Sequence, residues 1–182
     1  MKPFQPNPQQ LEAITNGATK LWIPAKHDIA NVSTDTITFL TLANEEQTWN
    51  LSEYLAVFSP LQPGESYFVQ EEFSDLMKDS IWYKRVIDKV PEVSCKLWKP
   101  ADQMTEAQSQ YKLTVTDVEV KSVQDNYGND KAELAGQSDN WLGYADDKFE
   151  QWYDSQYPNQ PYSSSPTGFL ITIERIKDVK EN

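Results

Sequence analysis

The sequence predicts a mainly β α+β fold built on a curved sheet or small β-barrel, with a helix near each end of the chain. Residues 111–125 form the longest predicted strand, because apolar and polar residues alternate along it. The alternation changes phase at Thr116 and Asp117. A slip by one residue means that the strand crosses to another face or carries a bulge, as strands of curled sheets do. Residues 168–176 carry one apolar stripe and are the expected partner strand.

The N-terminal helix is predicted from its end signals. Asn7 can cap the helix, Pro8 suits the first helical position, and Gly17 can adopt the left-handed conformation that ends a helix. Within this segment Leu11 and Ile14 would face the core.

Short strands and turns are expected between this helix and the long strand. The strands fall at residues 20–24, 36–42 and 66–73, and residues 81–86 would pair with the last of these as a hairpin. Residues 59–65 contain two prolines and a glycine, which predicts a turn. Residues 96–110 show no clean period, which predicts an ordered loop.

The second helix is expected over residues 139–153. One face of this helix would carry Trp141, Ala145, Phe149 and Trp152. Such an aromatic face predicts packing against the sheet. Because the sequence shows no repeat and no linker, we expect one domain over residues 1–177, followed by a frayed charged tail at residues 178–182.

The composition excludes several classes of function. The net charge of -12 and the pI of about 4.5 exclude a broad positive surface for double-stranded DNA. Cys95 is the only cysteine, so an internal disulfide is excluded, and with His27 as the only histidine the usual structural zinc sites are excluded too. The acidic pairs along the chain are interpreted as solvated turns and faces. We therefore expect no metal and no cofactor.

The sequence also bears on location. It has no apolar run of membrane-spanning length, and residues 1–10 lack the apolar region of a signal peptide. These features predict a cytoplasmic protein without a membrane partner.

Four short sequence segments, or blocks, spread over nearly the whole chain, resemble motifs of a known family and occur in the same order as in that family. They are residues 10–20, with Gly17 and Lys20; residues 62–71, with Pro63-Gly64-Glu65; Trp98-Lys99-Pro100, continuing through Met104 into residues 113–118; and residues 132–136. Together they resemble the ASCH family, a branch of the PUA-like β-barrels, and in particular its members from phages and prophages. The first block is similar to the family's opening helix and G-x-K motif, and the second to its P-G-D-x-x-x-V-R-E strand.

The resemblance implies a barrel with a cleft that recognises RNA or a nucleobase. In some small members it also implies amidohydrolase chemistry on acylated cytidine, attributed to a lysine, a threonine and a glutamate. This chain has Thr19, Trp22 and Ala135 at those places. Amide hydrolysis needs a nucleophile, a group that accepts its proton and a stabiliser for the oxyanion. Thr19 has no base beside it in the sequence, so we predict no catalytic residues.

Three of the four positions where relatives tend to have arginine carry no positive charge here, and one of these three carries a negative charge. Those positions hold Gln70, Lys99, Glu106 and Gln110. A site that used arginines for phosphate would lose most of its attraction here.

Six residues in or near the segments that border the family's cleft are the candidate ligand-binding residues. They are Thr19, Lys20, Trp22, Tyr67, Trp98 and Lys99. An aromatic ring stacks on a base whatever the charge nearby. Trp22, Tyr67 and Trp98 would therefore stack, while Lys20 or Lys99 would meet phosphate. Packing of Trp22 and Tyr67 in the core or at its rim is the alternative interpretation.

Three functions follow from these observations. The first is a non-catalytic ASCH-like module of phage or prophage origin, acting in the host cytoplasm, whose cleft takes a nucleobase, a nucleotide or single-stranded RNA. The second is an acidic module that binds a host protein. The third is an amidohydrolase with a rearranged site. His27 is interpreted as a surface loop residue, because no G-x-S-x-G elbow is present, and Cys95 as a passive thiol.

Overall fold

The computed structural model describes residues 1–41, 43–77, 80–84, 98–126, 131, 133–135 and 145–176. Strands predominate over helices, so the predicted mainly β α+β class is confirmed. The chain divides into two compact units, and it passes between them at four points. Unit 1 is Met1–Asn7, Ser66–Thr114 and Arg175–Asn182, and unit 2 is Pro8–Glu65 and Val115–Glu174. The predicted tail, residues 178–182, lies outside the described residues.

Unit 1 contains a small mixed sheet and a hairpin. Strand β1 (Lys2–Phe4) pairs in parallel with β6 (Ser66–Val69), and β6 pairs antiparallel with the first residues of β9 (Lys112–Ser122). Strands β7 (Phe73–Met77) and β8 (Ser80–Tyr83) form a hairpin. The hairpin was expected between residues 66–73 and 81–86, but residues 66–69 pair with β1 and β9, and only Phe73 of the expected first strand pairs with β8 in the described residues. Residues 85–86 lie outside the described residues.

The loop that was expected over residues 96–110 is anchored to this hairpin where the structure describes it. Lys99 forms an isolated antiparallel bridge with Phe73. The 3-10 helix η1 (Ala101–Gln103) follows. The bridge gives the loop a fixed register against β7.

Unit 2 is organised around the rest of β9, which pairs with β10 (Thr167–Ile176), and β10 pairs antiparallel with β2 (Lys20–Pro24). The predicted change of phase in β9 is confirmed. Val115 and Val118 are buried, and Thr116 and Asp117 between them are exposed. In the described strands of unit 2, β2 pairs only with β10, and in those of unit 1, β1 pairs only with β6. The described sheets are therefore open, and the closed-barrel alternative is wrong.

A second sheet lies within unit 2. Strands β3 (Asp28–Val32), β4 (Thr36–Leu40) and β5 (Glu46–Asn50) form an antiparallel sheet, which leads directly into helix α2 (Leu51–Phe58). Only β4 was predicted. The Asn50 side chain caps α2 by accepting a hydrogen bond from the Ser52 amide at 3.0 Å.

Helix α1 (Pro8–Thr15) has the predicted limits, and Gly17 after it has a φ of 92°. Ile14 is buried and Leu11 is half-buried. The Gln10 side chain donates to the carbonyl oxygen of Trp22 at 2.9 Å, which holds α1 against β2.

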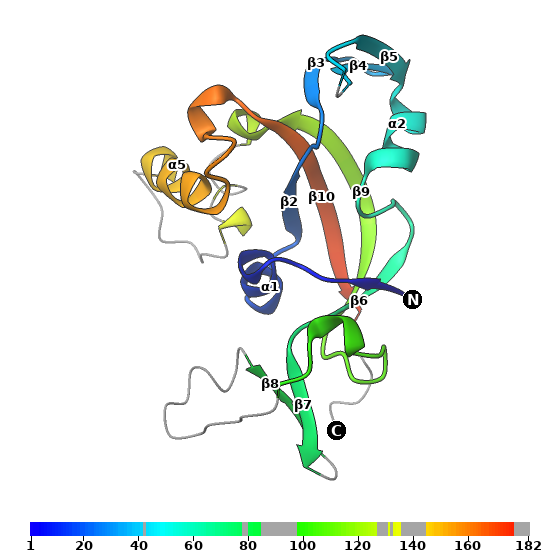
Figure 1. The fold of residues 1–182 in the computed structure, drawn as a ribbon, viewed down its shortest axis with the longest axis vertical. Helices are drawn as coiled ribbons and strands as arrows, with labels where there is room; N and C mark the ends of the chain where they lie inside the picture. Colours follow the sequence, from blue (N-terminus) through cyan, green and yellow to red (C-terminus); the bar gives the residue numbers. More distant parts are fainter. Residues whose placement is uncertain are drawn as a thin grey trace. The chain divides into compact units, whose positions relative to one another are not determined.

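Helix α5 (Ala145–Gln156) lies beside β2 and β10 in unit 2 (Figure 1). Its buried side chains, Phe149 and Tyr153, share a core cluster with Trp22 and Leu170 from the strands and with Val123 from the 3-10 helix η2 (Val123–Asp125). Three partly buried aromatic residues pack against this cluster: Trp152, Tyr157 and Tyr162. Tyr162 is the first residue of the 3-10 helix η3 (Tyr162–Ser164). The predicted aromatic face is confirmed for Phe149, while residues 139–144, with Trp141, lie outside the described residues.

Candidate functional site

The six candidate residues divide between the two units. Thr19, Lys20 and Trp22 belong to unit 2, and Tyr67, Trp98 and Lys99 belong to unit 1.

The indole ring of Trp22 is part of the core of unit 2. Its exposed fraction is 2%, and it packs with Phe149, Tyr153 and Leu170. Gly168 lies directly against this ring, because a Cβ atom at Gly168 would come within 2.7 Å of Trp22 Cζ2. A buried ring has no open face for a base. Stacking by Trp22 is therefore wrong, and the alternative interpretation as core packing is correct.

Tyr67 is buried in unit 1. Its exposed fraction is 4%, and it lies on β6 opposite Lys2 on one side and Leu113, which is fully buried, on the other. The ring is therefore covered by its neighbours and has no open face for a base, so the prediction that Tyr67 stacks is wrong as well.

Thr19 has a partner that the sequence did not indicate. The carboxylate of Glu133 accepts hydrogen bonds from the Thr19 backbone amide and, at 2.7 Å, from the Thr19 hydroxyl. Glu133 belongs to the fourth block and stands two positions before Ala135. The structure thus brings a carboxylate to Thr19, which has no such group beside it in the sequence. Lys20, the next residue, is half-buried on β2 opposite Thr172 of β10.

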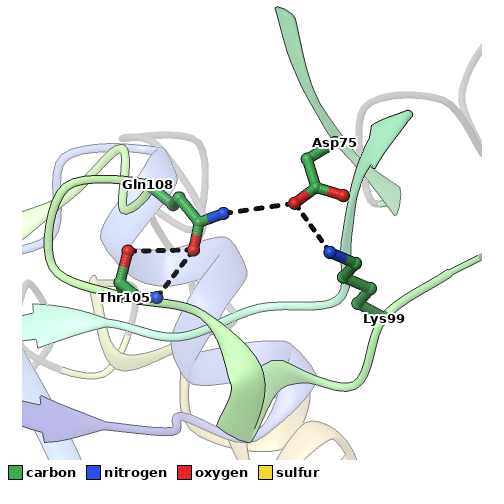
Figure 2. Close-up of polar contacts among 4 residues, drawn as sticks. All are labelled: Asp75, Lys99, Thr105 and Gln108. Carbon is green, nitrogen blue, oxygen red and sulfur yellow. Dashed lines mark hydrogen bonds and ion pairs between the residues drawn. The ribbon is translucent and has the colours of Figure 1, made fainter. Parts of the chain in front are cut away.

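The remaining two candidates, Trp98 and Lys99, are half-buried next to a group of polar side chains in unit 1. We call Asp75, Lys99, Thr105 and Gln108 the Asp75 cluster (Figure 2). Asp75 Oδ2 accepts a hydrogen bond from Lys99 Nζ at 2.7 Å and one from Gln108 Nε2 at 3.5 Å. The Gln108 Oε1 atom in turn accepts from the Thr105 amide and hydroxyl, both at 2.9 Å.

The backbone around the Asp75 cluster is fixed on several sides. The bridge between Phe73 and Lys99 holds Lys99 next to β7, and the Lys99 Nζ atom lies 5.7 Å from the centre of the buried Phe73 ring. Tyr83 of β8 donates its hydroxyl hydrogen to the Gln108 carbonyl oxygen at 2.8 Å. Because residues from β7, β8 and the following loop meet here, the side chains are held in place before any ligand arrives.

The Asp75 cluster is charged and accessible to solvent. The side chains of Asp75 and Lys99 keep exposed fractions of 32% and 43%. The hydrogen bond from Lys99 lowers the pKa of Asp75 below its ordinary value, against the effect of desolvation, so the carboxylate is ionised at neutral pH. Asp75 Oδ2 accepts both side-chain hydrogen bonds, and the Asp75 backbone N–H also lowers the pKa of the carboxylate.

The two units differ sharply in charge. Unit 1 contains 11 Lys and Arg against 10 Asp and Glu, a net charge of +1, whereas unit 2 contains 5 against 18, a net charge of -13. The acidity of the chain therefore resides in unit 2. Because the net charge of unit 1 is close to zero, unit 1 does not repel a phosphate group.

Two of the positions where relatives tend to have arginine have structural roles in unit 1. The Gln70 side chain is buried and donates to the Met104 carbonyl oxygen at 3.0 Å. Glu106 pairs with the N-terminal ammonium group at 2.9 Å. The side chains of Gln70 and Glu106 therefore hold segments of unit 1 together. Arg175, the arginine within the described residues, stacks on the Tyr111 ring, with its guanidinium carbon 4.7 Å from the ring centre.

His27 lies in the predicted loop, between β2 and β3, but it is not on the surface. It is half-buried, with its ring centre 4.6 Å from that of Phe58 and 4.9 Å from that of Phe39, and its Nδ1 atom lies 3.4 Å from the Tyr54 hydroxyl. The ring belongs to an aromatic cluster between the second sheet and α2. Cys95 lies outside the described residues.

Within the ranges that the structure describes, no group of three or more His, Cys, Asp or Glu side chains could hold a metal ion. The same residues include no helix that is both long enough and apolar enough to cross a membrane.

The chain was also compared with known proteins. No family model, no curated protein and no solved structure matches it.

Proposed function

We propose that the chain is a non-catalytic, ASCH-like binding module of phage or prophage origin that takes a nucleobase, a nucleotide or single-stranded RNA, and that unit 1 makes the contact. The observation that carries this proposal is the Asp75 cluster, in which Lys99, a predicted site residue, and Gln108 both donate to Asp75 at a partly exposed surface. Unit 2 contributes little to such binding, because its net charge is -13.

The chemistry of the Asp75 cluster suits the edge of a base. A nucleobase edge presents hydrogen-bond donors next to acceptors. Asp75 Oδ1 can accept from an exocyclic amine, and the Gln108 amide can donate its second N–H to a ring nitrogen or carbonyl oxygen. The Lys99 ammonium group supplies a positive charge for phosphate. Trp98, Trp82 and Tyr83 are half-buried aromatic residues in the same unit that can stack on a base.

A matched pair of lysine variants tests this proposal. Lys99→Gln and Lys84→Gln each remove one ammonium group of unit 1 that pairs with a carboxylate at 2.7 Å, Asp75 for Lys99 and Glu72 for Lys84. Calorimetric titration with nucleoside monophosphates and a short single-stranded RNA at low salt should show binding that Lys99→Gln weakens about tenfold and Lys84→Gln leaves within about twofold. Equal weakening by both variants would mean that only net charge matters.

A second candidate function rests on a separate observation, the bond between Thr19 and Glu133. A hydroxyl that donates to a carboxylate at 2.7 Å is a nucleophile next to its general base. In an amidohydrolase reaction Thr19 Oγ1 would attack the acyl carbon while Glu133 accepts its proton. The C–N bond would then break, and Glu133 would pass the proton to the departing amine. Water would attack the acyl ester on Thr19, releasing the acid and restoring the hydroxyl. This is the rearranged site that the sequence resemblance allows, with Glu133 in place of Ala135.

The test for this second function is acetate release from N-acetylcytidine. Thr19→Val and Glu133→Gln should each abolish the release, whereas Thr38→Val, which removes another hydroxyl of unit 2, should leave it unchanged. Wild-type protein that releases no acetate, or release that is indifferent to Thr19, would exclude hydrolysis at this position.

A further inference from the structure

Strand β5 has an open edge. In the part of the chain that the structure describes, β5 pairs with β4 on one side and with no strand on the other. Its residues are exposed, apart from Trp49, which is half-buried. The edge of such a strand presents backbone N–H and C=O groups to which a further strand can bond.

The register with β4 shows which backbone groups of β5 point outward. In an antiparallel pair, residue pairs that exchange hydrogen bonds alternate with pairs that exchange none. At one end, the Leu51 amide donates to the Asp35 carbonyl oxygen at 2.8 Å. At the other end, the Thr41 amide donates to the Glu45 carbonyl oxygen at 2.9 Å. Both pairs continue the register of β4 and β5, so the odd-numbered residues of β5 bond to β4.

The even-numbered residues of β5 therefore direct their backbone groups away from β4. These groups are the N–H and C=O of Glu46, the N–H and C=O of Thr48, and the N–H of Asn50. All three residues are exposed, and no other segment of the described chain pairs with this edge. Donors and acceptors at every second residue match the repeat of an extended chain.

Three other edge strands, β1, β2 and β3, are protected against pairing. Strand β1 has three residues, one of which is Pro3. At β2 the Gln10 side chain donates to the Trp22 carbonyl oxygen. Strand β3 has an irregular register between Ile29 and Asn31. Strand β5 has a regular register over five residues and contains neither proline nor lysine, so it lacks the features by which edge strands usually prevent pairing.

The charge around β5 is negative. Glu45 and Glu46 stand at its start, and Glu53 lies in the first turn of α2, which follows directly. Residues 27–65 contain no lysine and no arginine, and unit 2 has a net charge of -13. A second copy of this chain would bring the same negative charge to the edge and be repelled, whereas a basic segment would be attracted.

We infer that β5 binds an extended basic segment of another protein, which adds an antiparallel strand to the second sheet of unit 2. Antiparallel pairing continues the arrangement of β3, β4 and β5 and is the more stable one per residue. Main-chain hydrogen bonds to Glu46, Thr48 and Asn50 provide the affinity.

The side chains of the segment provide the selectivity. A lysine or arginine lies beside Glu46 on one face of the sheet. An apolar residue lies beside Trp49 on the other face, where the Trp49 ring centre is 5.5 Å from that of Phe58 in α2. This docking site lies in unit 2 and is independent of the nucleotide site proposed for unit 1.

A pair of methylated peptides tests the inference. The parent probe is a labelled peptide of about seven residues in which lysine and valine alternate. With lysines opposite Glu46 and Thr48, the lysine amides point toward β5 and the valine amides point away from it. N-methylation of the lysine amides should weaken binding at least about tenfold, and N-methylation of the valine amides should change it less than about threefold. Fluorescence anisotropy at low salt measures both, and the two peptides carry the same charge.

Two variants of Thr48 test the same contact from the side of the protein. Thr48→Pro removes an outward N–H group without removing a hydrogen bond to β4, and it should weaken binding of the parent peptide at least about tenfold. Thr48→Val keeps this N–H group but loses the same hydroxyl contact with Thr38, at 2.9 Å, and should leave binding within about twofold. Near-UV circular dichroism verifies that both variants are folded.

A charge pair tests the selectivity. Glu46→Gln and Asp117→Asn each remove one exposed carboxylate of unit 2. Glu46→Gln should weaken binding of the parent peptide about threefold more than Asp117→Asn, because Glu46 lies beside a bound lysine.

Three results would overturn the inference. The first is equal weakening by the two methylated peptides, and the second is no binding of the parent peptide at low salt. The third is a wild-type dimer in sedimentation analysis that Thr48→Pro dissociates, because the edge of β5 would then pair with a second copy of the chain.

Discussion

In unit 1 the side chains of Asp75, Lys99 and Gln108 meet at a partly exposed surface, whereas in unit 2 Trp22, Phe149 and Tyr153 meet in a buried core. Candidate residues in the two units therefore serve different purposes. The aromatic ring that was expected to stack in unit 2 stabilises the fold, and the lysine that was expected to meet phosphate in unit 1 is available next to a carboxylate. The difference shows that residue type alone does not locate a binding site, because burial decides which rings and charges a ligand can reach.

The largest expected effect tests the contrast between two tryptophans. Trp22→Ala should lower the free energy of unfolding by about 3–5 kcal/mol, because it leaves a cavity among Phe149, Tyr153 and Leu170. Trp98→Ala should cost clearly less, since the Trp98 ring is only half-buried. Urea denaturation of both variants measures this difference. Equal losses would remove the distinction between a core tryptophan in unit 2 and an accessible one in unit 1.

The variant Gly168→Ala should have the next largest effect on stability. A Cβ atom there would lie 2.6 Å from the Ile23 carbonyl oxygen as well as 2.7 Å from Trp22 Cζ2. The strand and the ring would have to move apart, which should cost about 1–3 kcal/mol of stability in the same denaturation experiment. A neutral substitution would contradict the close packing of Trp22 on β10.

The buried tyrosines of unit 2 should make stability depend on alkaline pH. Burial raises the pKa of Tyr54 and of Tyr153 from 10.0 to about 12. In the unfolded chain both hydroxyls ionise near their ordinary value, so the folded state holds more protons between these limits. The stability that the two groups contribute is complete below pH 10.0 and falls as the pH rises toward about 12.

Tyrosinate absorbance and urea denaturation across this range measure the effect. The double variant Tyr54→Phe, Tyr153→Phe should lose most of the alkaline slope, and a variant with the same slope as the wild type would contradict the burial of these hydroxyls.

The smallest effect concerns Asp75 in unit 1. Because the Lys99 bond lowers the pKa of Asp75, its contribution to stability is present above the unfolded pKa and is lost as the pH falls through the folded value. Lys99→Gln should return the pKa of Asp75 toward its ordinary value, and Lys84→Gln should not change it. Carbon-detected NMR of the Asp75 carboxyl group measures both. The same pKa in wild type and Lys99→Gln would mean that this ion pair does not form in solution.

The sequence allowed much of the sheet to be predicted. The change of phase at Thr116 and Asp117, the partner strand β10 and the limits of α1 all follow from local patterns of polarity and from end signals. Helix α2 was missed although Leu51, Tyr54, Leu55 and Phe58 have helical spacing, because Ala56 and Val57 between them make the segment look like a continuous apolar run. A second signal was Asn50, which caps the helix through its side chain.

The site could be predicted only in part, because its contacts are distant in sequence. Lys99 was identified, but its partner Asp75 is 24 positions away and Gln108 lies beyond it on a loop without a period. Glu133 is 114 positions from Thr19 and was passed over for Ala135 in the same block. Trp22 was misjudged because both Leu21 and Trp22 are buried, on opposite faces of β2, and alternation cannot reveal a strand that is covered on both sides.

The most direct test of a ligand site in unit 1 is an amide-resolved NMR titration of the labelled protein with nucleoside monophosphates and then a short single-stranded RNA at low salt. The proposal predicts chemical shift changes that cluster at Asp75, Lys99, Thr105 and Gln108 and that Lys99→Gln removes. Shifts confined to Thr19 and its neighbours in unit 2, or a spectrum unchanged at millimolar ligand, would contradict it.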